Sequence, residues 1–208
     1  MFILDKGGTL IDVHSMWGDW VTELARRLKG GGSPPVWERL FRAMGFDRRS
    51  GRIAPDGWLA TTMAELRQLT VELLCTAGLS QQPAEAIMED AWYAHDPVAM
   101  ARPLADLPAL FRGLRERGAK TAVATIDGGA PTEATFNRLN INRLVDALVC
   151  GDDDLPPKPA PDMVQAVSTA VEVDPALTVV VGDTVADMRM GRAAGVGLVL
   201  GVLCGVSS

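Results

Sequence analysis

Residues 3–12 read ILDKGGTLID and predict both a strand and the position of a carboxylate at its end. The apolar pair Ile3-Leu4 ends in Asp5, and a glycine-rich turn with Thr9 follows at once. A short apolar run that stops at a polar residue and a Gly-Gly turn predicts a buried strand whose carboxyl end carries a carboxylate. In an open parallel sheet, ligands bind beyond the carboxyl ends of the strands. Asp5 is therefore the first candidate site residue.

From about residue 104 onward, short apolar runs alternate with amphipathic segments, which is typical of a parallel α/β sheet. The expected helices are 105–117, 132–139, 161–171 and 187–194, and the expected strands are 121–125, 147–150, 178–181 and 197–202. The run 2–4 is a strand of the same kind. We expect an α/β fold with a Rossmann-like parallel sheet.

The roughly ninety residues between the first strand and this region are expected to be helical throughout. Helical spacing covers 17–29, 36–46, 62–77 and 82–93, with breaks at the Gly-Gly-Gly-Ser-Pro-Pro run 30–35 and at 50–57. We predict a core made of 1–14 and 97–208 and an inserted helical cap over 15–96. All five tryptophans fall in this insertion (Trp17, Trp20, Trp37, Trp58 and Trp92), and we interpret them mainly as the core of a small bundle.

Composition narrows the class of protein. With 48% hydrophobic residues, 22% charged residues and a net charge of −6, the chain resembles a globular protein and does not resemble a protein that coats nucleic acid. The N-terminus shows neither the basic segment nor the long apolar stretch of a signal peptide, and no apolar run is long enough to span a membrane. We expect a cytoplasmic monomer or homodimer. Cys75, Cys150 and Cys204 are too scattered for a zinc or redox motif and are expected to be reduced thiols.

Polar residues directly after the predicted strands supply one consistent chemistry. Asp5, Thr125 and Asp183 each follow an apolar run, and Lys158 lies in the loop after another. A carboxylate that attacks a phosphate needs the substrate's negative charge neutralised, which a nearby lysine and Mg²⁺ held by further carboxylates can do. Hydroxyls such as those of Thr9 and Thr125 can donate hydrogen bonds to phosphate oxygens. Each of these residues could alternatively be an ordinary cap, turn or surface charge, but they occur together at the expected ligand edge.

The chain resembles the haloacid dehalogenase superfamily, with DKGGT at Asp5, then Thr125, KPAP at Lys158 and GDTVAD from Gly182. The helical insertion resembles the cap of the phosphoglycolate-phosphatase-like branch. The resemblance implies a Mg²⁺-dependent hydrolase of a small phosphorylated metabolite in which Asp5 forms an aspartyl-phosphate. It implies catalytic roles for Asp5, Lys158 and Thr125. It implies metal ligation by Asp5, Asp183 and the carbonyl of Gly7, with Asp187 in support. It also implies phosphate binding by Gly8, Thr9, Thr125, Ile126 and Lys158.

Gly7 departs from the pattern of the phosphatases, which carry a second aspartate two residues after the nucleophile. That aspartate protonates the leaving alcohol and later activates water. Its absence indicates an impaired phosphatase, a non-catalytic phosphate-binding or regulatory protein, or a branch with different chemistry such as the dehalogenases or phosphonoacetaldehyde hydrolases. The phosphonoacetaldehyde hydrolases use a cap lysine, for which this chain offers Lys29.

Three other residues could replace the missing acid–base group: Asp12, His14 and His95, all near the expected junctions of cap and core. For the two histidines an ordinary solvated hinge position is the simpler interpretation. Arginines gather in residues 39–52, where they could attract a second anionic group of the substrate or form a solvated helix face. They are Arg39, Arg42, Arg48, Arg49 and Arg52.

Overall fold

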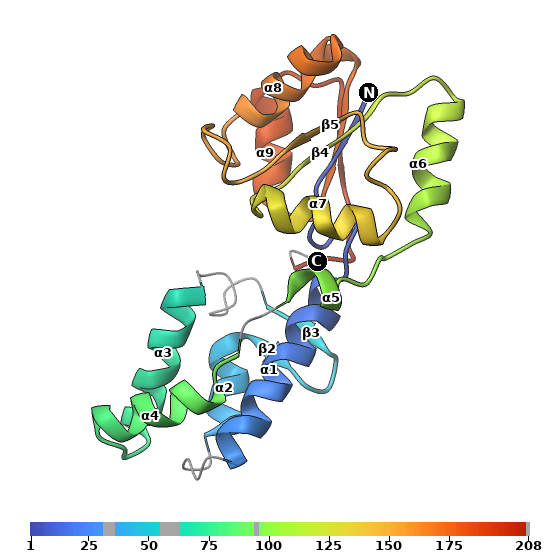
Figure 1. Cartoon of the computed structure of the whole chain (residues 1–208). Helices are drawn as coiled ribbons and strands as arrows, with labels where there is room; N and C mark the ends of the chain where they lie inside the picture. Colours follow the sequence, from blue (N-terminus) through green and yellow to red (C-terminus); the bar gives the residue numbers. More distant parts are fainter. Residues whose placement is uncertain (31–35, 55–62, 94–95, 207–208) are drawn as a thin grey trace. The chain divides into compact units, whose positions relative to one another are not determined.

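The computed structural model describes residues 1–30, 36–54, 63–93 and 96–206 in two compact units (Figure 1). The core unit comprises Met1–Val13 and Pro97–Ser208, and the inserted unit comprises His14–Asp96.

The core unit contains a five-stranded sheet in the order β5-β4-β1-β6-β7. The strands are β1 (Phe2–Leu4), β4 (Thr121–Ala124), β5 (Ala147–Val149), β6 (Val179–Gly182) and β7 (Leu198–Gly201). Every neighbouring pair is parallel, which confirms the expected α/β sheet. Leu4 lies level with Val123 on one side and Val181 on the other. The residues that follow these three therefore meet at one edge of the sheet.

Helices cover both faces of the sheet (Figure 1). In the core unit the helices are α5 (Pro97–Met100), α6 (Leu107–Glu116), α7 (Gly129–Arg138), α8 (Asp162–Val171), the short 3₁₀ helix η2 (Pro175–Leu177) and α9 (Val185–Ala193). Successive strand residues point to opposite faces. Ile3 therefore packs with Met163 of α8 and Met190 of α9, whereas Leu4 packs with Phe111 of α6 and Phe136 of α7. Burial on both faces explains why the central strand β1 is apolar at every position rather than at alternate ones.

The sequence pattern predicted that the inserted unit is helical throughout. This prediction is wrong, because the unit also contains a short hairpin. The unit contains α1 (Val13–Gly30), α2 (Trp37–Met44), α3 (Met63–Thr76), α4 (Gln81–Ala91) and an antiparallel hairpin of β2 (Phe46–Asp47) and β3 (Arg52–Ile53). Gly45 ends α2 in the left-handed conformation, with φ of 73°. The Asp47 carboxylate then accepts hydrogen bonds from the Arg49 N–H and the Ser50 hydroxyl, which stabilise the hairpin turn.

Aromatic packing supports the interpretation of the tryptophans as core residues. Trp20 is fully buried, and its ring meets those of Trp17 and Trp92 edge-on at centroid distances of 5.8 and 5.3 Å. Tyr93 contacts Trp20 at 5.9 Å. Trp58 lies outside the described residues.

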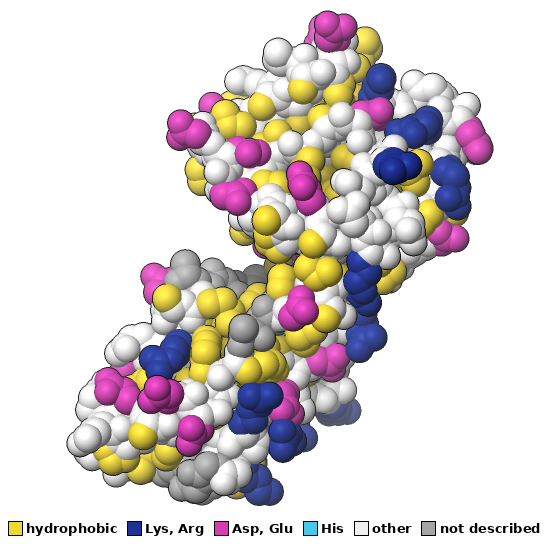
Figure 2. All heavy atoms as spheres, in the orientation of Figure 1, with side chains coloured by type: hydrophobic (Ala, Val, Ile, Leu, Met, Phe, Trp, Pro, Cys, Tyr) yellow, Lys and Arg dark blue, Asp and Glu magenta, His cyan; other side chains and the backbone are white. Residues whose placement is uncertain are grey.

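The surface carries both signs of charge, and on the face drawn in Figure 2 acidic and basic side chains are interspersed over each unit. Among the described residues, no helix is both long and apolar enough to cross a bilayer. The three cysteines are free thiols, as expected.

Candidate active site

The order of the strands creates a switch point between β1 and β6. From β1 the chain builds the sheet outward through β4 and β5, and it then returns to the other side of β1 for β6 and β7. Ligand sites of open α/β sheets lie at the carboxyl ends of the strands at such a point. Asp5 follows β1 and Asp183 follows β6, so the two acids lie on adjacent strands there.

Lys158 joins two of the predicted acids. Its Nζ donates to Asp5 Oδ1 at 2.5 Å and to Asp187 Oδ1 at 2.6 Å. The side chains of Lys158, Asp5 and Asp187 are 5%, 11% and 1% exposed, so these charge-assisted hydrogen bonds are shielded from water.

Asp187 is held from a second direction as well. Its Oδ2 accepts hydrogen bonds from the Thr184 N–H at 3.0 Å and the Thr184 hydroxyl at 2.5 Å, while Thr184 Oγ1 caps the Asp187 N–H. This capping box begins α9. Asp187 therefore serves both as a helix cap and as a fixed partner of Lys158.

The three carboxylates of Asp5, Asp183 and Asp187 each offer an oxygen within 4.8 Å of the others. With all three ionised, Lys158 neutralises one charge and two negative charges remain. Asp183 Oδ1 is buried and accepts no hydrogen bond from the described residues. Oxygen ligands, excess negative charge and an unpartnered buried oxygen are the features that a hard divalent cation such as Mg²⁺ requires, so these residues fit the cation.

The pKa values at this cluster reflect burial first and the neighbouring charges second. Burial raises the pKa of Asp5 to about 7, Lys158 opposes this shift, and Asp187 and Asp183 add to it. Burial also raises the pKa of Asp183. For Lys158, burial alone would lower the pKa, but Asp5 and Asp187 outweigh it and hold the ammonium charged.

In cation-free buffer, we expect Asp5→Asn to gain stability relative to the parent chain as the pH rises. Folding raises the pKa of Asp5 from 3.8 to about 7, so between these values the folded protein holds a proton that the unfolded chain has lost. The stability contributed by protonation of Asp5 is therefore present below its ordinary pKa and lost as the pH rises through about 7. Thermal unfolding of the variant and the parent chain in EDTA, at about pH 5.5 and about pH 8, measures the change in relative stability. A difference in Tm, variant minus parent, that did not increase with pH would contradict the assignment.

The hydrogen-bonding groups of the predicted phosphate-binding residues differ in whether they are already used. Thr125 is buried, and its Oγ1 accepts the Asp127 N–H at 3.2 Å, which leaves the hydroxyl hydrogen for another acceptor. Thr9 Oγ1 is buried without a hydrogen-bond partner among the described residues. The Gly8 N–H, by contrast, donates to the Ile11 carbonyl at 2.8 Å and is already used, and the Ile126 side chain is 66% exposed.

Gly8 has a steric reason to be glycine. Its φ is +80°, and a Cβ there would overlap the Asp183 carboxylate. The absence of a side chain at Gly8 therefore lets the loop after β1 approach Asp183.

Lys6 is a site-supporting residue that the sequence patterns did not identify. It is buried, and its Nζ donates to Asp127 Oδ2 at 2.9 Å and to Thr132 Oγ1 at 3.2 Å. The pair ties the loop that follows Asp5 to the loop that follows Thr125. A charged residue directly after Asp5 and an acid two positions after Thr125 were the available signals.

The other candidate acid–base groups are Asp12, His14 and His95. His14, in the inserted unit, is buried, and its Nδ1 accepts the Ile53 N–H at 3.0 Å, which joins α1 to β3. The Asp12 N–H donates to the Arg102 carbonyl at 2.8 Å. His95 lies outside the described residues.

The basic residues singled out in the insertion are exposed. Lys29 lies at the surface with its Nζ 5.8 Å from the centre of the Trp37 ring, which is not the apolar pocket that a Schiff-base lysine needs. All five arginines of residues 39–52 are exposed, and Arg48 lies over Phe41 at 5.0 Å.

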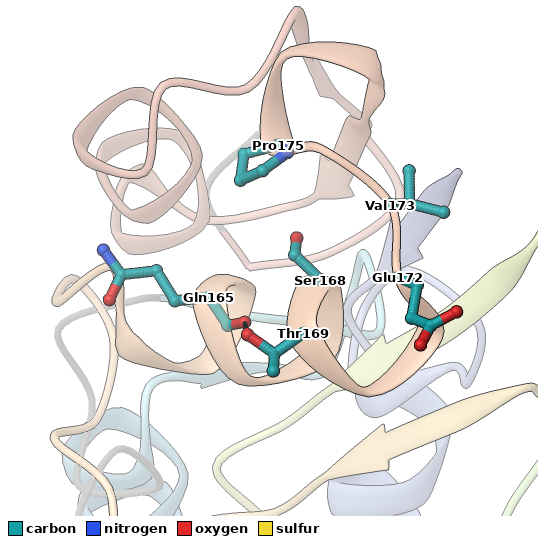
Figure 3. A pocket seen from close by; sticks show the side chains of 6 residues that line it. All are labelled: Gln165, Ser168, Thr169, Glu172, Val173 and Pro175. Atoms are coloured by element: carbon teal, nitrogen blue, oxygen red, sulfur yellow. Dashed lines mark hydrogen bonds between the residues drawn. The ribbon is translucent and has the colours of Figure 1, made fainter.

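A hollow of about 300 Å³ lies at the far end of α8 (Figure 3). Lys158 precedes α8, whereas the hollow is lined by residues of α8 from Gln165 onward and by the turn that follows the helix. Its lining residues are Gln165, Ser168, Thr169, Glu172, Val173 and Pro175. It therefore belongs to the opposite edge of the core and not to the carboxylate site.

Residues 1–195 match the family model of the haloacid dehalogenase-like hydrolases. The chain belongs to this family. It is 24% identical over 193 residues to the N-acetylmuramic acid 6-phosphate phosphatase of Pseudomonas aeruginosa. The matched region covers 93% of this chain and 77% of that protein. It is 29% identical over 103 residues to the phosphoglycolate phosphatase of Aquifex aeolicus, which covers 50% of this chain and 48% of that protein.

Among solved structures, a haloacid dehalogenase-superfamily hydrolase of subfamily IA from Geobacter sulfurreducens PCA matches 95% of this chain and 84% of its own length. The TM-score is 0.67 at 16% identity, and this likeness shows the fold. The family's Rossmann-like core and helical cap agree with the parallel sheet and with the helices of the inserted unit.

Proposed function

We propose that the chain is a Mg²⁺-dependent phosphohydrolase of a small phosphorylated metabolite and that Asp5 is its nucleophile. In this proposal the inserted unit serves as a cap, and Gly7 impairs turnover. The single observation that carries the proposal is the bridge of Lys158 to Asp5 and Asp187 beside the unpartnered oxygen of Asp183. Membership of a hydrolase family whose curated relatives include phosphatases supports it.

In the first step, an oxygen of the Asp5 carboxylate attacks the phosphorus and the bond from phosphorus to the ester oxygen breaks. Lys158 orients Asp5 and offers positive charge, and the hydroxyls of Thr9 and Thr125 donate to phosphate oxygens. Asp5, Asp183 and the Gly7 carbonyl would hold Mg²⁺, which supplies charge neutralisation to the phosphoryl group. The ester oxygen leaves with the electron pair and needs a proton.

In the second step, water attacks the phosphorus of the aspartyl-phosphate, the bond to Asp5 breaks, and inorganic phosphate leaves. The attacking water must lose a proton. Because Gly7 has no side chain, position 7 can neither protonate the first leaving group nor deprotonate this water. Alkyl phosphates are therefore slowed at both steps, whereas an ester whose leaving group is already a stable anion is slowed only at the second.

We expect p-nitrophenyl phosphate with Mg²⁺ to give a burst of p-nitrophenolate that approaches one per chain, followed by a slow steady state. Stopped-flow absorbance measures the burst, and acid quenching followed by mass spectrometry measures phosphate on Asp5. Asp5→Asn, which keeps the size of the side chain and removes the nucleophile, should give neither.

A second candidate, a non-catalytic protein that binds phosphate esters, is favoured by Gly7 alone. It predicts saturable binding of a phosphate ester in calorimetry with no burst and no phosphorylated Asp5. That combination would contradict the hydrolase proposal.

A further inference from the structure

The segment Cys204–Val206, which follows β7, lies against the loops that carry Asp5 and Asp183. The Val206 N–H donates to Asp183 Oδ2 at 2.9 Å. The Cys204 thiol donates to the Gly8 carbonyl at 3.1 Å. One short segment thus contacts residues that follow both β1 and β6.

Gly205 lies between these two contacts and is buried against Asp183. A Cβ at Gly205 would overlap Oδ2, Cγ and Cβ of Asp183. A Cβ at Gly8 would overlap the same carboxylate from the loop after β1. The Asp183 side chain is therefore enclosed between two residues that have no side chain of their own.

The two carboxylate oxygens of Asp183 differ in their hydrogen bonding. Oδ2 is occupied by the Val206 N–H, and Oδ1 is buried without a hydrogen-bond partner among the described residues. Rotation of the carboxylate about its Cβ–Cγ bond would break the bond to Val206.

We propose that Cys204–Val206 is a positioning element of the cation site, which holds Asp183 in the orientation that presents Oδ1 to the cation. The inference rests on the proposed function, because it takes Asp183 as a Mg²⁺ ligand. Groups that hydrogen-bond to a metal ligand fix its orientation, and their loss typically lowers metal affinity ~10–100-fold. The segment acts through Asp183 and is therefore a positioning element.

The test compares Gly205→Ala with Gly201→Ala, a change of the same size in the adjoining strand β7. At Gly201 the added Cβ would meet only Met188 Sδ, at an ordinary contact distance of 3.9 Å. Neither glycine has a positive φ, so backbone strain does not distinguish the two variants. Isothermal titration calorimetry of the full chain with MgCl₂ measures Kd, and circular dichroism checks that each variant is folded.

We expect Gly205→Ala to weaken Mg²⁺ binding ~10-fold or more and Gly201→Ala to leave it near the parent value. Val206→Pro removes the N–H donor without placing a Cβ at position 205, and it should weaken binding similarly. This second variant decides the question if Gly205→Ala does not fold. Unchanged Mg²⁺ affinity in a folded Gly205→Ala or Val206→Pro protein would overturn the inference.

Asp183→Asn separates failure of this inference from failure of the proposed function. If the parent chain shows no Mg²⁺ binding that Asp183→Asn removes, both are overturned. If that binding is present and is insensitive to changes at 205 and 206, only the role of the segment is overturned.

Discussion

Gly7→Asp is expected to raise the steady-state turnover of alkyl phosphate esters by ~10²–10⁴-fold, the range that a positioned general acid–base group contributes. The new carboxyl group would lie two residues from Asp5, where it can protonate the leaving oxygen and then deprotonate water. Phosphate release with Mg²⁺ from a panel of small phosphate esters measures the gain. The burst with p-nitrophenyl phosphate should disappear in this variant, because the second step no longer limits turnover.

A side chain at position 7 must fit beside Val13. A Cβ on Gly7 would lie 3.1 Å from Val13 Cγ1, so the valine must move by a few tenths of an ångström. The double variant Gly7→Asp with Val13→Ala removes this obstacle. Gly7→Asn imposes the same steric demand without an acid and should show no gain. Equal activity of the parent chain and Gly7→Asp would show that another residue carries the proton.

Lys158→Met is expected to lower the free energy of unfolding of the cation-free protein by about 3–5 kcal/mol near pH 8 and to abolish phosphorylation of Asp5. The methionine keeps the apolar stem but leaves Asp5 and Asp187 buried with no opposing charge, and removing one partner of a buried pair has this cost. Denaturant unfolding in EDTA and acid quenching with mass spectrometry measure the two effects.

Lys120→Met is the matched control. The Lys120 side chain is 56% exposed and its Nζ lies 3.8 Å from Asp146 Oδ1, so its ion pair is a surface one. Such pairs contribute about 0–1 kcal/mol. Similar losses of stability for the two variants would show that Lys158 does not neutralise a buried cluster.

Most of the core unit could be predicted because its signals are local. Short apolar runs indicated all five strands to within one or two residues. The hairpin of the inserted unit was missed because its local signal is weak. Two-residue strands are too short to show a period, and Gly45, whose left-handed backbone conformation ends α2, lies within the stretch 36–46 that has helical spacing.

From the sequence alone, Asp5, Thr125, Lys158 and Asp183 could be assigned to one edge of a parallel sheet, because parallel strands present their carboxyl ends together. Which of these groups touch became known from the tertiary structure. The bridge of Lys158 to Asp5 and Asp187, the pair of Lys6 and Asp127, and the contact of Cys204–Val206 with Gly8 and Asp183 all depend on the order of the strands and on the paths of their loops. Periodicity reports the local environment of a residue, whereas contacts between residues distant in the chain follow from how the elements pack.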